Sequence, residues 1–345
     1  MDYSGINAKI KAMRGSLLKQ ADYERLCQAG SVESIARELS GHPAYRNAMS
    51  QMVNSEVHRD LVEQKILLSL SDDFARIYHF INDFSVKKYM NAYFLSFKLG
   101  IIKLLLCMVY DERDISYSVP ELNLLIGRDM RIDTAKLKAS KNAAEFIQNL
   151  QGAKFYSMLT DAFTSQSSLF EIEMQLDLYY YMNLWKEQKQ YLDTVNRNMM
   201  EKIIGSEIDL RNIMWVYRLK KFYNINDSRI YAYLIPISHK LKRPHLMRMV
   251  QCATLSELSD EIRNSPYGDV FGDLNNIEKA YYKKMLSLYN NASKMHPQSL
   301  AHTVSFVFFK ELELRNLTSL LEGVRYNLKP QDIMSYLNLT GEAEA

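Results

Sequence analysis

Apolar residues return every three or four positions along most of the chain. The pattern is clearest near the C-terminal end, where one stripe is formed by Leu317, Leu320, Leu321, Val324 and Leu328. This spacing places side chains on one face of an α-helix, whereas a half-buried strand needs strict alternation of apolar and polar positions. No stretch alternates over the length of a strand. The pattern therefore predicts an all-α fold.

Residue usage supports the same prediction. The 345 residues include only 12 Gly and 7 Pro, the two residues that most disfavour helix interiors. Ser31 with Glu33, and Thr254 with Glu257, place a capping hydroxyl just before a first-turn acid. That arrangement is typical of a helix start. We therefore expect helices to begin at both places.

Internal repetition is the most informative feature of the chain. Three segments share one pattern, at Ser31–Arg46, Asn142–Ser157 and Thr254–Gly268. Each is predicted to form a short amphipathic helix with a glutamate near its start, which is Glu33, Glu145 and Glu257 in turn. Each has a tyrosine near its end, after a break in the helix, and these are Tyr45, Tyr156 and Tyr267. The three glutamates follow each other at intervals of 112 residues. Helical-repeat solenoids have units of only about 33–47 residues. The spacing instead favours three divergent copies of one helical subdomain, at residues 1–115, 116–228 and 229–345.

A second motif occurs in the later two copies. It reads acid, apolar, acid, Leu, Arg, Asn, and its polar members are Glu207, Asp209, Arg211 and Asn212 in one copy and Glu311, Glu313, Arg315 and Asn316 in the next. The matching helix of the first copy, Phe97–Asp111, lacks the acid and the Asn. Glu207 and Arg211, like their counterparts, lie four residues apart and can form an ion pair on a helix. Because apolar residues surround the motif, its Asn must be hydrogen-bonded. We interpret the motif as pinning one helix to the next, with contact to a partner as the alternative.

Composition and charge exclude several classes of protein. The 43 basic and 40 acidic residues leave a formal charge of +3, which gives no reason to expect nucleic-acid binding. The three cysteines lie far apart and imply no disulfide framework. The N-terminal residues lack the apolar core of a secretion signal, and the most apolar stretch, Leu99–Tyr110, is shorter than the roughly 20 residues of a membrane span. We expect a cytoplasmic protein.

Sequence signatures of catalysis are absent. There is no phosphate-binding loop, no H-E-x-x-H, no C-x-x-C and no G-x-S-x-G, so no catalytic residue, cofactor or metal is predicted. Glu171, Glu173 and Asp177 lack the Glu-x-x-His partners of a helical di-metal site, and we interpret them as a solvated face. The basic run around Lys240, Lys242 and Arg243 is either a solvated loop or a surface for an acidic partner or anionic lipid. The 23 Tyr and 18 Met add weight to an interaction protein.

The motifs together resemble the C-subunit family of bacterial and archaeal V-type ATPases, whose eukaryotic relative is the d subunit. The opening of the chain is similar to the family's, with Tyr3, Asn7, Lys9, Lys11, Leu17, Leu18 and Tyr23 in the matching places. The stretch Lys310–Val324, followed by Leu328-Lys-Pro330, is similar to the family's last helix and the turn after it. With the triplication, the resemblance covers essentially the whole chain.

The resemblance implies a non-catalytic rotor subunit. Family members form a funnel of three similar helical subdomains with pseudo-threefold symmetry, one chain per complex. The funnel sits on the cytoplasmic face of the membrane proteolipid ring, so its membrane association is indirect, and it receives the central shaft. Torque then passes between shaft and ring during ATP hydrolysis or synthesis, coupled to proton or sodium transport. Lys240, Lys242 and Arg243 are expected among the partner contacts.

Two other interpretations stay open at this point. A free-standing helical interaction scaffold would share the bulk composition of the chain but would not need a triplication. A helical enzyme of the terpenoid-synthase kind would need an Asp-rich metal motif, and Asp72-Asp73 is the nearest approach to one.

Overall fold

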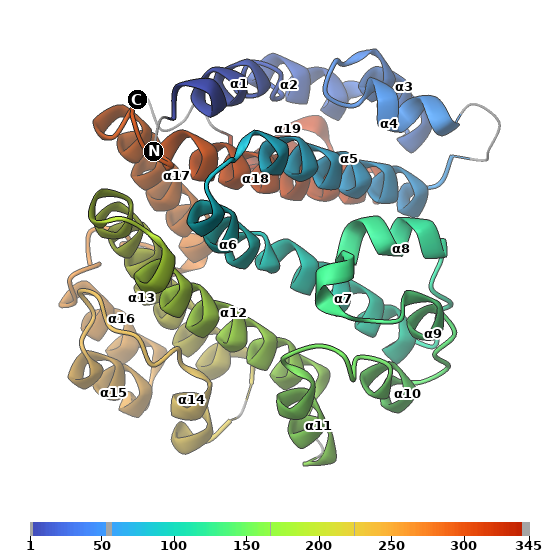
Figure 1. Ribbon diagram of the computed structural model, residues 1–345. Coiled ribbons are helices and arrows are strands. Elements are labelled where there is room, and N and C mark those ends of the chain that lie inside the picture. Colours follow the sequence, from blue (N-terminus) through green and yellow to red (C-terminus); the bar gives the residue numbers. More distant parts are fainter. Residues whose placement is uncertain (1–2, 53–56, 166, 224, 340–345) are drawn as a thin grey trace. The chain divides into compact units, whose positions relative to one another are not determined.

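The computed structural model describes residues 3–52, 57–165, 167–223 and 225–339 (Figure 1). Every regular element within these ranges is a helix, which confirms the all-α prediction. The chain divides into two compact units: unit 1 comprises Met1–Asp83 and Tyr282–Ala345, and unit 2 comprises Phe84–Tyr281. Unit 1 is therefore built from both ends of the sequence.

Unit 1 is organised around one long C-terminal helix, α18, against which the N-terminal helices α1, α2, α3 and α5 pack (Figure 1). Its helices are α1 (Ser4–Arg14), α2 (Gln20–Gln28), α3 (Val32–Gly41), α4 (Arg46–Met49), α5 (Arg59–Phe80), α18 (Ala301–Arg325) and α19 (Pro330–Tyr336), with a 3-10 turn at Ser50–Met52. Helix α17 (Ile277–Met295) starts in unit 2, and its larger part belongs to unit 1. The predicted stripe lies in the core of this unit at Leu317, Leu320, Leu321 and Val324. Leu328 follows the end of α18 and is exposed.

Unit 2 contains the two longest helices of this part of the chain, which pack against each other: α12 (Leu169–Tyr191) and α13 (Thr194–Phe222). Shorter helices surround them: α6 (Phe84–Tyr93), α7 (Leu95–Tyr110), α8 (Val119–Ile126), α9 (Thr134–Lys138), α10 (Ala143–Gln148), α11 (Tyr156–Thr164), α14 (Asp227–Tyr233), α15 (Arg243–Gln251) and α16 (Leu255–Arg263), with 3-10 turns at Arg128–Met130 and Leu274–Asn276. Helix α13 buries residues on nearly all sides, as expected for a central helix.

The helix starts of the repeated segments follow directly from the sequence. Ser31, Asn142 and Thr254 are the N-caps of α3, α10 and α16, and each side chain accepts a hydrogen bond from the backbone N–H three residues ahead. Such a cap satisfies an amide that the first helical turn leaves unpaired. The two predicted helix starts, at Ser31 and Thr254, are confirmed.

The most apolar part of the chain extends further than the sequence pattern suggested. Helices α6 and α7 together cover Phe84–Tyr110, 27 residues whose most apolar window has a mean hydropathy of 1.9, enough by length and composition to cross a membrane. However, 61% of that window is buried inside the protein, and both helices pack against α12. A buried core helix passes the same test, and the packing of α6 and α7 favours that explanation.

Candidate functional site

The acidic motif on α13 holds a loop of unit 2 in place. The Asp209 carboxylate is fully buried and accepts hydrogen bonds from the backbone N–H groups of His239, Lys240 and Leu241, at 3.3, 2.7 and 2.8 Å. The Tyr267 hydroxyl donates a fourth, at 2.9 Å. These three amides lie just before α15, so one carboxylate fixes the path of the chain into that helix.

Asn212 makes a second connection one turn further along α13. Its side-chain amide donates to the Ile235 carbonyl at 3.0 Å and accepts from the Ile235 N–H at 2.9 Å. This pairing satisfies a fully buried amide on both sides. We call Asp209, Asn212 and the backbone groups that they bind the α13 latch.

Unit 1 contains an equivalent arrangement on α18. Glu313 accepts hydrogen bonds from the backbone N–H of Leu18, just before α2, and from the Tyr45 hydroxyl, both at 2.5 Å. Asn316 pairs with the backbone of Asn338 in both directions at 2.9 Å. Asn338 follows Asn316 by 22 positions, while Ile235 follows Asn212 by 23. We call Glu313, Asn316 and their partners the α18 latch.

The two latches differ in one buried charge. Lys310, one turn before Glu313, is almost entirely buried and donates to the Glu313 carboxylate at 2.7 Å and to the Tyr45 hydroxyl at 2.9 Å. Asp73 lies 3.9 Å from the same ammonium group. The α18 latch therefore contains an ion pair, and its partners Leu18 and Tyr45 come from the other end of the chain.

The first copy of the motif uses different chemistry, as its sequence indicated. Helix α7 carries Lys98, whose ammonium group binds both carboxylate oxygens of Asp129 at 2.6 and 2.7 Å, ahead of α9. The aromatic side chain buried after α10 is Phe155, while the predicted equivalent Tyr156 is only half-buried. A phenylalanine has no hydroxyl to donate, and α7 offers no carboxylate to receive one.

The outer members of the motif lie among tyrosines. Glu207 and Arg211 form the expected ion pair at 3.2 Å, and the Tyr181 hydroxyl donates to Glu207 at 2.6 Å. The Arg211 guanidinium lies over the rings of Tyr181 and Tyr281, 5.3 and 5.5 Å from their centroids. In unit 1, Arg315 lies over the Tyr282 ring at 5.4 Å and forms no salt bridge within the described residues. Glu311 is half-buried on the same helix.

Burial determines how the latch side chains titrate. Burial raises the pKa of Tyr267, and the Asp209 carboxylate raises it further. Burial and the Glu313 carboxylate raise the pKa of Tyr45 in the same way. Both phenols therefore stay protonated and keep donating. Burial lowers the pKa of His239 below its ordinary value, and the nearby Asp209 only partly opposes this.

The basic run lies directly on the α13 latch. The side chains of Lys240, Lys242 and Arg243 are all exposed, although the backbone N–H of Lys240 is bound by Asp209. The Lys242 ammonium group donates to the His239 carbonyl at 2.7 Å, and Arg243 lies over the Tyr231 ring at 5.3 Å. The structure thus joins two features that the sequence presented separately.

The carboxylates of α12 correct one interpretation from the sequence. Glu171 is buried, not solvated: it accepts hydrogen bonds from the Tyr233 hydroxyl and the Arg229 guanidinium. Asp177 is half-buried and pairs with Lys103 of α7 at 2.6 Å. Arg229 and Tyr233 follow Glu171 by 58 and 62 positions, and Lys103 lies on a different helix from Asp177, so the sequence pattern could not reveal these partners. Within the described residues, no group of three or more His, Cys, Asp or Glu side chains could hold a metal ion.

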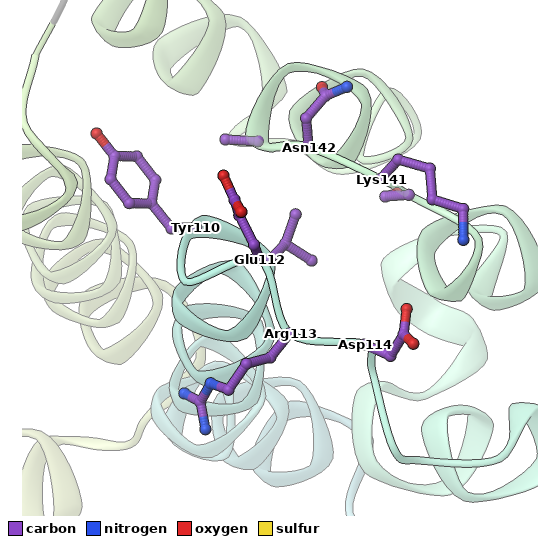
Figure 2. A pocket seen from close by; sticks show the side chains of 9 residues that line it. Tyr110, Glu112, Arg113, Asp114, Lys141 and Asn142 are labelled. Carbon is purple, nitrogen blue, oxygen red and sulfur yellow. The ribbon is translucent and has the colours of Figure 1, made fainter.

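A recess of about 460 Å³ opens where α7 ends (Figure 2). Tyr110, Glu112 and Asp114 line it together with Lys141 and Asn142, the N-cap of α10. Its charges are of both signs, and Asn142 is already bonded to the backbone of α10. Nothing in this lining selects one kind of ligand.

Comparison with known proteins assigns the family. The family model described as ATP synthase (C/AC39) subunit matches residues 6–336. The chain belongs to this family. Curated relatives named as the C subunit of A-type ATP synthase include the protein of Methanocaldococcus jannaschii, 22% identical over 97% of this chain and 86% of the relative. The protein of Halorubrum lacusprofundi is 24% identical over 96% of each chain, and that of Pyrococcus abyssi is 22% identical over 96% of this chain and 89% of the relative.

The family membership confirms the resemblance seen in the sequence. All the residues of the two latches except Asn338 lie inside the matched range, and so does the basic run. Sequence reasoning located the motif residues but missed their partners, chiefly Leu18, Tyr45, Tyr267 and the backbone at Ile235. The repeated terminal tyrosines were the available signal for two of these.

Proposed function

We propose that this chain is a non-catalytic rotor subunit of a V-type or A-type rotary ATPase. It forms the socket that joins the central shaft to the proteolipid ring and transmits torque between ATP hydrolysis or synthesis and ion transport. The observation that carries the proposal is the family match over residues 6–336. Relatives named as the C subunit of A-type ATP synthase, matched over nearly the whole chain, support it.

The proposed socket is peripheral, on the cytoplasmic face of the membrane, with one chain per complex. It consists of three related helical subdomains. Support comes from the latches: α13 holds the loop before α15 and Tyr267 after α16, and α18 holds the loop before α2 and Tyr45 after α3.

The latches also suit a part that transmits force. Each long helix is joined to its neighbours through buried, fully paired polar groups, not through apolar contact alone. Hydrogen bonds have directions, so such joints resist sliding more strongly than an apolar face does. A torque-bearing socket needs this stiffness.

Ion pumping in inverted membrane vesicles tests the proposal. Vesicles from cells lacking this chain should keep ATP hydrolysis by the catalytic head but lose ATP-driven ion uptake, and adding the purified chain should restore uptake. Normal uptake without the chain would contradict the proposal and favour a free-standing interaction scaffold.

A further inference from the structure

A second surface of unit 2 has the features of a binding site. A groove of about 530 Å³ lies between α12, α13 and the loop that the α13 latch holds. It is lined by Trp185 from α12, by Asn198, Glu201 and Lys202 from α13, and by the loop residues Ser238, His239 and Lys240. These elements belong to one compact unit, so the groove is part of a single packed body.

The groove is electropositive. The exposed side chains of Lys202 and Lys240 form no salt bridge within the described part of the chain. Lys189 lies 5.3 Å from the centroid of the Trp185 ring. Glu201 is the one acid in the lining. The unpaired ammonium groups favour a ligand that carries carboxylates or other anionic groups.

The loop side of the groove is fixed before any ligand arrives. Asp209 binds the backbone N–H groups of His239, Lys240 and Leu241. Gly205 lets the His239 ring pack against α13, since a Cβ at that position would lie 2.7 Å from the ring. A preformed site avoids much of the conformational entropy lost when a mobile loop becomes ordered on binding.

The lining distinguishes a polypeptide from a phosphate surface. Glu201, Asn198 and Ser238 offer acceptors as well as donors, which suits the N–H and C=O groups of a peptide backbone. A phosphate group would use the donors alone and would leave these acceptors without a partner. The half-buried Trp185 ring adds an apolar surface for a side chain of the ligand.

We propose that this groove binds an acidic polypeptide segment of a partner protein. Carboxylates of the segment pair with Lys202 and Lys240, and an apolar side chain lies on Trp185. The inference rests on the proposed function for one point only, that the segment belongs to a neighbouring subunit of the complex. The chemistry of the groove stands apart from that assignment.

Binding to the isolated full-length chain is the direct test. The probe is a short blocked peptide rich in glutamate with one central leucine, and a lysine-rich peptide of equal length is the control. The chain has two tryptophans, and Trp215 is buried, so a change in Trp185 fluorescence reports occupancy of the groove. We expect a saturable change that weakens as salt is added and disappears in Trp185→Phe.

Charge reversal makes the test specific. Lys202→Glu with Lys240→Glu should weaken peptide binding by about tenfold or more, because two attractions become repulsions. Lys136→Glu with Lys154→Glu changes the net charge equally at exposed positions outside the groove and should bind as the unmodified chain does. Equal affinities for the two variants, or no saturable binding, would overturn the proposal. Binding to phosphatidylglycerol vesicles but not to the peptide would also overturn it, in favour of lipid.

Assembly separates this inference from the proposed function. If the unmodified chain does not co-purify with ATPase subunits, the proposed function fails, whatever the peptide result. If it does co-purify, the groove variant should be recovered in the complex in smaller yield than the control variant, and more so as salt rises. Equal recovery of both variants would show that the groove is not the docking surface, while the proposed function stands.

Discussion

Removing the Asp209 carboxylate is the sharpest perturbation of the fold. Asp209→Ala deletes the acceptor for three backbone N–H groups and one phenol at a fully buried position. A hydrogen bond to a charged group contributes about 1.5–3 kcal/mol, so a simple sum over four bonds would be about 6–12 kcal/mol. The true loss is smaller, because Lys240 is exposed and water can reach the released loop, and because the buried charge disappears as well. We expect unit 2 to lose about 3–5 kcal/mol.

The isosteric variant isolates the charge. In Asp209→Asn, the amide oxygen can take the place of Oδ2 and keep the hydrogen bonds from Lys240, Leu241 and Tyr267. The amide NH2 group then takes the place of Oδ1, so only the longer hydrogen bond from the His239 N–H is lost. We expect a loss of about 1–2 kcal/mol. Asp161→Ala, at an exposed position of α11, is the control and should change stability by less than about 0.5 kcal/mol.

Two measurements check this reasoning. Urea unfolding followed through Trp215, which is buried on α13, gives the free energy of unfolding of unit 2. Amide hydrogen exchange of Lys240 and Leu241 reports the loop itself and should become much faster in Asp209→Ala. A loss below about 1 kcal/mol with unchanged exchange at both amides would refute the claim that the carboxylate holds the loop.

Three further predictions concern the latches and the groove. Glu313→Gln leaves the buried Lys310 without its close counter-ion, so the free energy of unfolding of unit 1 should fall by about 2–4 kcal/mol. Limited proteolysis should then cleave the first 50 residues earlier, and unchanged cleavage would contradict the role of the α18 latch. Gly205→Ala should lower the free energy of unfolding by about 1–3 kcal/mol, because the added methyl group clashes with His239. Replacing Gly by Ala inside a helix ordinarily raises stability by about 1 kcal/mol, and a gain of that size in thermal unfolding would show that the contact with His239 is unimportant. Burial lowers the pKa of His239, whose charged neighbours are Asp209, Glu201, Lys240 and Lys242. As the pH falls, this histidine is therefore protonated in the unfolded chain before it is protonated in the folded one, and the free energy of unfolding should decrease below about pH 6.5. His239→Gln should reduce that slope in urea titrations at several pH values, and an unchanged slope would assign it to other groups.

The sequence was sufficient for what depends on local pattern. Helical periodicity and low Gly and Pro content predicted an all-α fold, and the capping residues Ser31 and Thr254 predicted two helix starts. The motif residues were also found, because Asp209 with Asn212 and Glu313 with Asn316 repeat with the same spacing.

What the sequence did not reveal depends on contacts between distant residues. Leu18 is 295 positions from Glu313, and Tyr45 is 268 from the same residue. No periodicity links such positions, so the dependence of α18 on the N-terminal helices was invisible. The solvated face predicted for α12 was wrong for the same reason, since Arg229 and Tyr233 cover Glu171 from a later part of the chain.

The two latches use different acids. Both carboxylates accept hydrogen bonds from backbone amides, and the longer Glu313 also binds the ammonium group of Lys310. Helix α7 carries neither acid and instead forms the Lys98–Asp129 ion pair. Helices α7, α13 and α18 are therefore each joined by polar groups to a segment that precedes a short helix, although different residues form the joint in each case.

The central claim, that this chain links the shaft of a rotary ATPase to its membrane ring, is tested most directly by purifying the tagged chain from gently solubilised source membranes and identifying the co-purifying proteins by mass. The account predicts catalytic ATPase subunits, shaft and proteolipid ring in one complex, and separation of the ring from the rest when the chain is deleted. Recovery of the chain alone, or of a complex that stays intact without it, would contradict the account.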